Sequence, residues 1–483
     1  MFFLVLGSLR TRLWQYAGVL VVVVMSAALV TTLTTVLDRV HQVSAEGGAE
    51  KAAGSLLGLV GGTSGLTAWL LVVNTMSLVV QQRRREIGAL RTIGATARQL
   101  RLEIVGEALV ISLAGAAAGA GLGLAAAGPA LAWLIRNGVL EPGPTGGLSL
   151  PGFIAGVLCT TGIAVLAAWA ATNGPMRISP IAALREAEVE RRAMPTGRAV
   201  GAFVMLGLAW ASWDWYGRRS GPHEAINGTM ALCLLLILSA WLLLPLLVRP
   251  IAALSYVPGR LLSRYSGTLA AANSAAATRR VAAMAGPVLI AAGLSAMLLC
   301  GNSVSQQTDS RPTVVSASTR TIAPAAPETA RKRAVEETRQ QQAQADKRQE
   351  RNAVGLRILM VPLITFSAIG ILNTLLLATR RRRQEFATLR LTGSTRGQLL
   401  RMLGWESAAV VLSGLSAATA VVTVSLTGLA SRLPLPTPDL LTLLPWGPLA
   451  QVALGCAGLG LLGVLVPGLL VLRVHPSQVA RAE

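Results

Sequence analysis

Ten long apolar runs constrain the fold of this chain more than any other feature of its sequence. Each run is close to the roughly twenty residues that a helix needs to cross a bilayer core. The runs cover residues 16–37, 57–80, 105–134, 152–172, 200–217, 227–248, 282–300, 356–378, 405–428 and 447–471. Only 13% of the residues are charged, whereas a soluble protein carries about 25%. We therefore predict an all-α polytopic membrane protein with about ten transmembrane helices.

Arginine supplies most of the positive charge, and its distribution predicts the topology. The formal net charge is +21, a value that would indicate nucleic-acid binding in a soluble domain. Here the arginines flank the apolar runs, where they contact lipid headgroups and set orientation, so we expect no nucleic-acid partner. With a cytoplasmic N-terminus, 27 Lys and Arg residues fall in cytoplasmic segments and 6 in short external loops. The positive-inside rule then predicts that both termini are cytoplasmic.

The sequence contains no pattern typical of a metal site or a nucleotide site. The four cysteines lie in or beside apolar runs, where we expect them to pack as small apolar side chains. The three histidines are isolated from one another. None of the three lysines follows the Gly-rich turn that a phosphate-binding loop requires. We therefore expect no catalytic residue and no cofactor bound by this chain itself.

A basic segment between the second and third runs recurs between the eighth and ninth. Residues 83–107 read RRREIGALRTIGATARQLRLEIVGE, and residues 382–406 read RRQEFATLRLTGSTRGQLLRMLGWE. The copies lie 299 residues apart, and ten of their twenty-five positions are identical. At the same spacing, Asn74-Thr75 in the second run matches Asn373-Thr374 in the eighth. The chain is thus predicted to contain two four-helix halves, with runs five and six between them.

Each basic segment is predicted to form a short helix, a sharp bend and a second helix that enters the membrane. Apolar residues recur at helical spacing, and Gly94 suits the end of a helix. Thr96 and Gln99 fit a capping box for the helix that follows. The second copy keeps both features, at Gly393 and at residues 395–398. A helix that only anchors the fold needs charge and amphipathicity but not this shared spacing, so the repeat favours a further role.

Four polar residues inside the runs are candidate functional residues. Intramembrane carboxylates are costly and are often functional. Glu107 and Glu406 lie near the predicted cytoplasmic side, and we expect each to pair with a basic residue near the preceding bend. For Asn74 and Asn373 we expect hydrogen bonds between helices, with substrate contact as the alternative.

At these residues the chain resembles the FtsX-like permease family, the membrane subunits of MacB-type (type VII) ABC transporters. RRREIGALRTIGAT, at 83–96, is similar to the family's signature after the second helix of its four-helix core. ISPIAALRE, at 178–186, resembles the end of that core. The resemblance implies one core at 1–187, a second at 268–483, and a connector at 188–267 that contains helices five and six.

The resemblance also implies a function and a partner. The chain is expected to be a permease subunit of the bacterial plasma membrane that couples ATP hydrolysis to export or to mechanical work. The ATP-Mg would be bound by separate cytoplasmic ABC ATPase subunits, two per chain, which dock on coupling helices at 83–94 and 382–393. The coupling residues that the resemblance implies are Arg83, Arg84, Arg85, Glu86, Arg91, Gly94, Arg382, Arg383, Glu385, Arg390 and Gly393.

Ten helices with one sizeable external insert, between the seventh and the eighth, is a layout that resembles the BceB-like permeases. That insert, the external loop 301–355, begins rich in Ser, Thr and Pro and continues into a helix-favouring stretch at 327–352. We expect a disordered lead-in and then an exposed helix, which is either solvated or binds an external partner. Two other functions stay open: an ion-driven secondary transporter, which would show broken helices and midplane charges, and a regulatory scaffold that controls an external enzyme.

Overall fold

The computed structural model is mainly helical over the residues that it describes, and no strand occurs among them. The described residues are 2–43, 62, 65–77, 79–80, 83–136, 149–176, 196–218, 222–262, 270, 278–319, 340, 364–365, 368–373, 383–432 and 444–473. This agrees with the predicted all-α polytopic fold.

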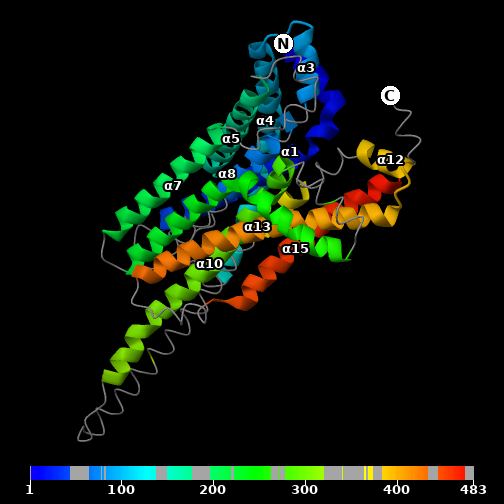
Figure 1. Ribbon diagram of the computed structural model, residues 1–483. Coiled ribbons are helices and arrows are strands. Elements are labelled where there is room, and N and C mark those ends of the chain that lie inside the picture. The colour runs from blue at the N-terminus through cyan, green and yellow to red at the C-terminus, as the bar shows by residue number, and fades with distance from the viewer. Residues whose placement is uncertain are drawn as a thin grey trace, which may run out of the picture.

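The helices are grouped in chain order by the predicted halves and connector (Figure 1). The first half contains α1 (Phe2–Val43), α3 (Arg84–Thr92), α4 (Ala97–Arg136) and α5 (Leu150–Met176). The connector contains α7 (Thr196–Gly217) and α8 (Pro222–Leu262). The second half contains α10 (Thr278–Thr319), α12 (Arg383–Leu391), α13 (Arg396–Arg432) and α15 (Trp446–Arg473). Residues 65–77 and 368–373 are also helical and belong to the second helix of each half.

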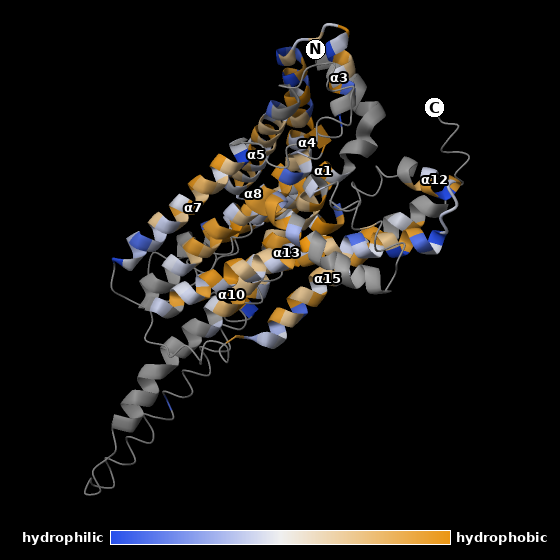
Figure 2. Cartoon of the chain, viewed as in Figure 1, coloured by the Kyte–Doolittle hydropathy of each residue, from blue (hydrophilic) through white to orange (hydrophobic). Residues whose placement is uncertain are grey.

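Seven helices of the described chain are long and apolar enough to cross a membrane. They match seven of the ten predicted runs: 16–37, 105–134, 152–172, 227–248, 282–300, 405–428 and 447–471. The run at 200–217 forms α7, which contains three tryptophans and Asp214 and is not among these seven. The runs at 57–80 and 356–378 lie partly outside the described residues. Figure 2 shows the apolar residues along the middle of the long helices.

In the first half, α4 packs on α1 by means of glycines. A Cβ atom at Gly119 would lie 2.2 Å from the carbonyl oxygen of Val24, and one at Gly123 would lie 2.4 Å from that of Ala28. Without side chains at these positions the two backbones approach closely, as small residues allow in membrane helices. The equivalent positions of α13, 299 residues later, are Ala418 and Val422, so the second half lacks this glycine pair.

The two short basic helices lie near one end of the molecule, and α10 projects from the other end (Figure 1). The start of α1 and the end of α15 lie at the same end as α3 and α12. The expectation of disorder at the start of the 301–355 loop is wrong as far as residue 319, because α10 continues unbroken to Thr319. A membrane helix that is already formed supplies the nucleus for this extension. Each residue added to the helix therefore costs little conformational free energy. At 1.5 Å per residue, the helix after Gly301 extends about 27 Å.

Candidate functional site

The first short helix, α3, packs on the start of α4 through one apolar face. Ile87 is buried in a small cluster with Val80, Leu100 and Ile104. The opposite face and the end of the helix are open, and Ile93 is 84% exposed. The helix is therefore held against α4 while its end stays accessible.

The bend after α3 has the geometry that the sequence predicts. Gly94 has a φ of +105°, a left-handed conformation that costs residues with a Cβ atom about 1–2 kcal/mol. The Ala95 amide donates to the Leu90 carbonyl at 3.0 Å, which closes the helix end. The Thr96 amide donates to Gln99 Oε1 at 3.0 Å, and the Gln99 amide donates to Thr96 Oγ1 at 3.3 Å. This reciprocal pair is the capping box that starts α4.

The second copy repeats this geometry between α12 and α13. Gly393 has a φ of +98°, and the Ser394 amide donates to the Leu389 carbonyl at 2.9 Å. The Thr395 amide donates to Gln398 Oε1 at 2.9 Å, and the Gln398 amide donates to Thr395 Oγ1 at 3.3 Å. Two segments with partly different sequences thus form the same helix–bend–helix unit.

An ion pair fastens the first short helix to α4. Arg83, directly before α3, donates from Nη1 to Glu107 Oε2, and both side chains are buried. The partner of Glu107 is therefore Arg83, which lies at the opposite end of α3 from the bend where a basic partner was expected. Because the Arg83 side chain is buried, it does not lie on the exposed face of the short helix with Ile93. Glu406, at the equivalent place in α13, is half-buried, and Arg382 lies outside the described residues.

Of the remaining predicted coupling residues, the structure places Glu86, Arg91 and Arg390 half-buried on the two short helices. The backbones of four others are helical, but their side chains lie outside the described residues: Arg84, Arg85, Arg383 and Glu385. The two units are brought to the same end of the molecule and not to a single cluster (Figure 1).

The two intramembrane asparagines make hydrogen bonds between helices. Asn74 Nδ2 donates to the carbonyl of Ala283 on α10 at 3.2 Å. Asn373 Nδ2 donates to Thr75 Oγ1 at 3.4 Å. Both asparagines are buried, and each bond connects one half of the chain to the other.

Arg101, in the second turn of α4, contacts α5. The sequence analysis did not identify this contact. Its guanidinium lies over the Trp169 ring, 5.8 Å from the centroid, and donates to Asn173 Oδ1 at 3.0 Å. In the sequence Arg101 is one of many basic residues, and its partners are about seventy residues away. Only the packing of α5 against α4 distinguishes it from the others.

The described residues include no group of His, Cys, Asp and Glu side chains that could hold a metal ion. Cys159, Cys233, Cys300 and Cys456 are free, and the last three are buried. The candidate site therefore consists of the two helix–bend–helix units and the polar contacts of the adjoining membrane helices.

The comparison with protein families gives the same two-fold division. The family described as FtsX-like permease C-terminal matches the chain twice, at residues 58–180 and 357–476. Each match contains one short basic helix and its bend, and together the matches cover half of the chain. A comparison with curated proteins returned no match.

Proposed function

Because this chain belongs to the FtsX-like permease family, we propose that it is the membrane subunit of a type VII ABC transporter driven by a separate ATPase. The family consists of membrane transport subunits, and the seven apolar helices make the chain a multi-pass membrane protein of the bacterial plasma membrane. In this proposal ATP-Mg binds to the ATPase, and movement of α3 and α12 drives export or mechanical work.

The observation that carries the proposal is the unbroken path from each short helix into the membrane. α4 has 40 residues and α13 has 37, so each is more than 50 Å long, well beyond the ~30 Å bilayer core. Each begins directly at a bend closed by hydrogen bonds. A displacement applied to α3 or α12 is therefore passed to a long helix instead of being absorbed by a flexible loop.

Exposed apolar side chains at the ends of the short helices support a protein partner. Ile93 is 84% exposed and Leu391 is 63% exposed, and both lie among arginines. Large apolar groups are enriched at the core of protein interfaces, with arginine also favoured there. One such end in each half supports the binding of two ATPase subunits per chain.

The ion-driven alternative receives less support. Such transporters bind ions where membrane helices are interrupted, whereas α4 and α13 are continuous. The buried carboxylate of Glu107 is paired with Arg83, which is not how an empty cation site is arranged. The scaffold alternative keeps one supporting observation, the part of α10 beyond Gly301, which could carry motion to an external partner.

The test is purification of the chain from its native membrane, with the bound subunits identified by mass spectrometry and MgATP hydrolysis measured. We expect two ATP-binding subunits per chain. The double variant Ile93→Asp/Leu391→Asp should lose most of the bound ATPase, because both changes place a charge in the proposed interface. Arg136→Glu, an exposed change at the far end of α4, is the control and should bind normally. Retention of the ATPase by the double variant would refute the proposal.

A further inference from the structure

The two halves meet through their second helices. Leu70, in the second helix of the first half, belongs to the apolar cluster formed mainly by α8, α10, α13 and α15. Conversely, Ile369, in the second helix of the second half, packs against the cluster of the first half. A Cβ atom on Gly370 would lie 2.7 Å from Leu71 Cδ1. Each second helix thus packs partly against the core of the opposite half.

Asn74 and Asn373 make polar bonds across this junction, and we name them the asparagine contact. Asn74 binds the Ala283 carbonyl on α10, the first helix of the second half. Asn373 binds Thr75 Oγ1 in the first half. The asparagines occupy equivalent positions, 299 residues apart, and are 6% and 8% exposed. The repeat therefore places one inter-half donor on each second helix.

The first helix of the first half leaves room for Asn373. A Cβ atom at Gly18 would lie 2.1 Å from Asn373 Oδ1, a separation that no side chain tolerates. Glycine at this position leaves the Asn373 amide its place against α1, whereas a Cβ atom there would push the amide aside. Asn373 is consequently held between α1 and the 65–77 helix.

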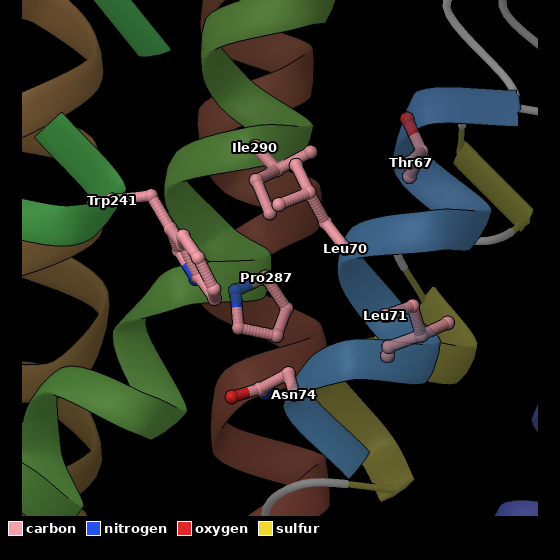
Figure 3. A pocket seen from close by; sticks show the side chains of 8 residues that line it. Thr67, Leu70, Leu71, Asn74, Trp241, Pro287 and Ile290 are labelled. Atoms are coloured by element: carbon pink, nitrogen blue, oxygen red, sulfur yellow. The ribbon is translucent and has the colours of Figure 1, made fainter. Parts of the chain in front are cut away.

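The connector borders the same junction (Figure 3). Asn74 lines a narrow, mainly apolar pocket together with Leu70, Pro287 and Trp241 of α8. Arg198 of α7 lies over the Trp241 ring, 5.4 Å from its centroid, and donates to the Trp241 carbonyl at 3.1 Å. The Asn74 amide is thus surrounded by apolar groups, where a hydrogen bond is stronger and an unpaired polar group is costly.

Along the chain, each asparagine precedes the short helix of its own half. α3 begins at Arg84 and α12 at Arg383, each ten residues after its asparagine. Since each bond crosses to the other half, a change in the separation of the halves has to stretch or break it.

From this geometry we infer that Asn74 and Asn373 are positioning residues that set the resting separation of α3 and α12 by bonding each half to the other. The contact belongs to the membrane subunit alone. It does not require a bound ATPase, so it is tested independently of the proposed function.

The experiment measures the distance between α3 and α12 in the isolated chain. Spin labels are attached at Ile93→Cys and Leu391→Cys, with the four native cysteines replaced by alanine, in lipid nanodiscs without ATPase. Pulsed electron paramagnetic resonance should give one narrow distance distribution. In Asn74→Leu and Asn373→Leu the distribution should broaden or shift, and most strongly in the double variant. The control is Ser413→Ala, which removes a buried hydroxyl bonded within its own helix, to the Ala409 carbonyl at 2.6 Å; it should resemble the unmodified chain.

A further variant, Gly18→Ala, keeps both asparagines but displaces the Asn373 side chain. It should reproduce the broadening of Asn373→Leu, and it decides the question if the double asparagine variant fails to fold. Distance distributions identical to that of the unmodified chain in Gly18→Ala and in both single asparagine variants would overturn the inference. Loss of ATPase binding in the co-purification experiment leaves this result unaffected.

Discussion

At the scale of single residues, the Arg83–Glu107 pair is the most consequential contact. Both side chains are buried, and taking two charges out of water costs several kcal/mol per ion before their attraction is counted. Such a pair is weak evidence for stability, but breaking it by removing one partner is strongly destabilising. The pair joins the residue before α3 to the third turn of α4 and so fixes the position of the short helix. The short helix cannot slide along α4 without separating the two charges.

We predict that Glu107→Ala lowers stability by about 3–5 kcal/mol, because the Arg83 guanidinium stays buried without its carboxylate. The double variant Arg83→Met/Glu107→Leu removes both charges and should recover most of this loss. Thermal unfolding in detergent, followed by tryptophan fluorescence, measures both. Equal melting temperatures for Glu107→Ala and the unmodified chain would show that the pair contributes little.

At the scale of helices, the two halves differ in how their first and third helices pack. α4 approaches α1 through Gly119 and Gly123, whereas Ala418 and Val422 stand at the equivalent positions of α13. Gly414 is the glycine that α13 retains, against Val288 of α10. The backbones of α1 and α4 therefore approach closely at the two glycines, whereas α13 carries side chains at the two equivalent positions.

We predict that Gly119→Ala destabilises the first half by about 1–3 kcal/mol, because the new methyl group meets a backbone oxygen that cannot move aside. Gly121→Ala is the matched control, since nothing lies within 4 Å of a Cβ atom there, and alanine favours helix over glycine. Hydrogen exchange of α1 and α4 amides should rise in the first variant only. Equal exchange in both variants would mean that the α1–α4 packing is not tight at Gly119.

At the scale of the whole molecule, the arrangement separates a basic end from an end with a projecting helix. α3, α12, the start of α1 and the end of α15 lie together, and α10 extends from the opposite end (Figure 1). Apolar residues predominate along the long helices between them (Figure 2). With the arginine distribution, this arrangement predicts that both short helices face the cytoplasm.

Labelling with a membrane-impermeant maleimide tests this orientation in a chain without its native cysteines. Ile93→Cys and Leu391→Cys should react only after the cells are opened. Arg218→Cys, directly after the C-terminal end of α7, should react in intact cells. All three positions are exposed, so access to the reagent depends on the side of the membrane. Reaction of Ile93→Cys in intact cells would reverse the predicted topology.

The features that the sequence alone predicted are those that depend on neighbouring residues. Length and apolar composition determine which segments span a bilayer. The hydrogen bonds that close a helix end and form a capping box join residues within five positions of each other, as the Ala95–Leu90 and Thr96–Gln99 bonds illustrate. The internal repeat needs no structure at all to be seen. For these reasons the membrane fold and both helix–bend–helix units could be predicted.

The partners of the buried polar groups depended on the tertiary structure. Nothing near Asn74 in the sequence indicates Ala283, and nothing near Asn373 indicates Gly18. Glu107 pairs with Arg83, 24 residues earlier in the chain, because α3 folds back against α4. The sequence by itself predicted which segments are long and apolar enough to cross the membrane, seven of which the described residues confirm, and where the chain bends, since both depend on local free energies. The contacts that join the two halves were decided by packing between residues hundreds of positions apart.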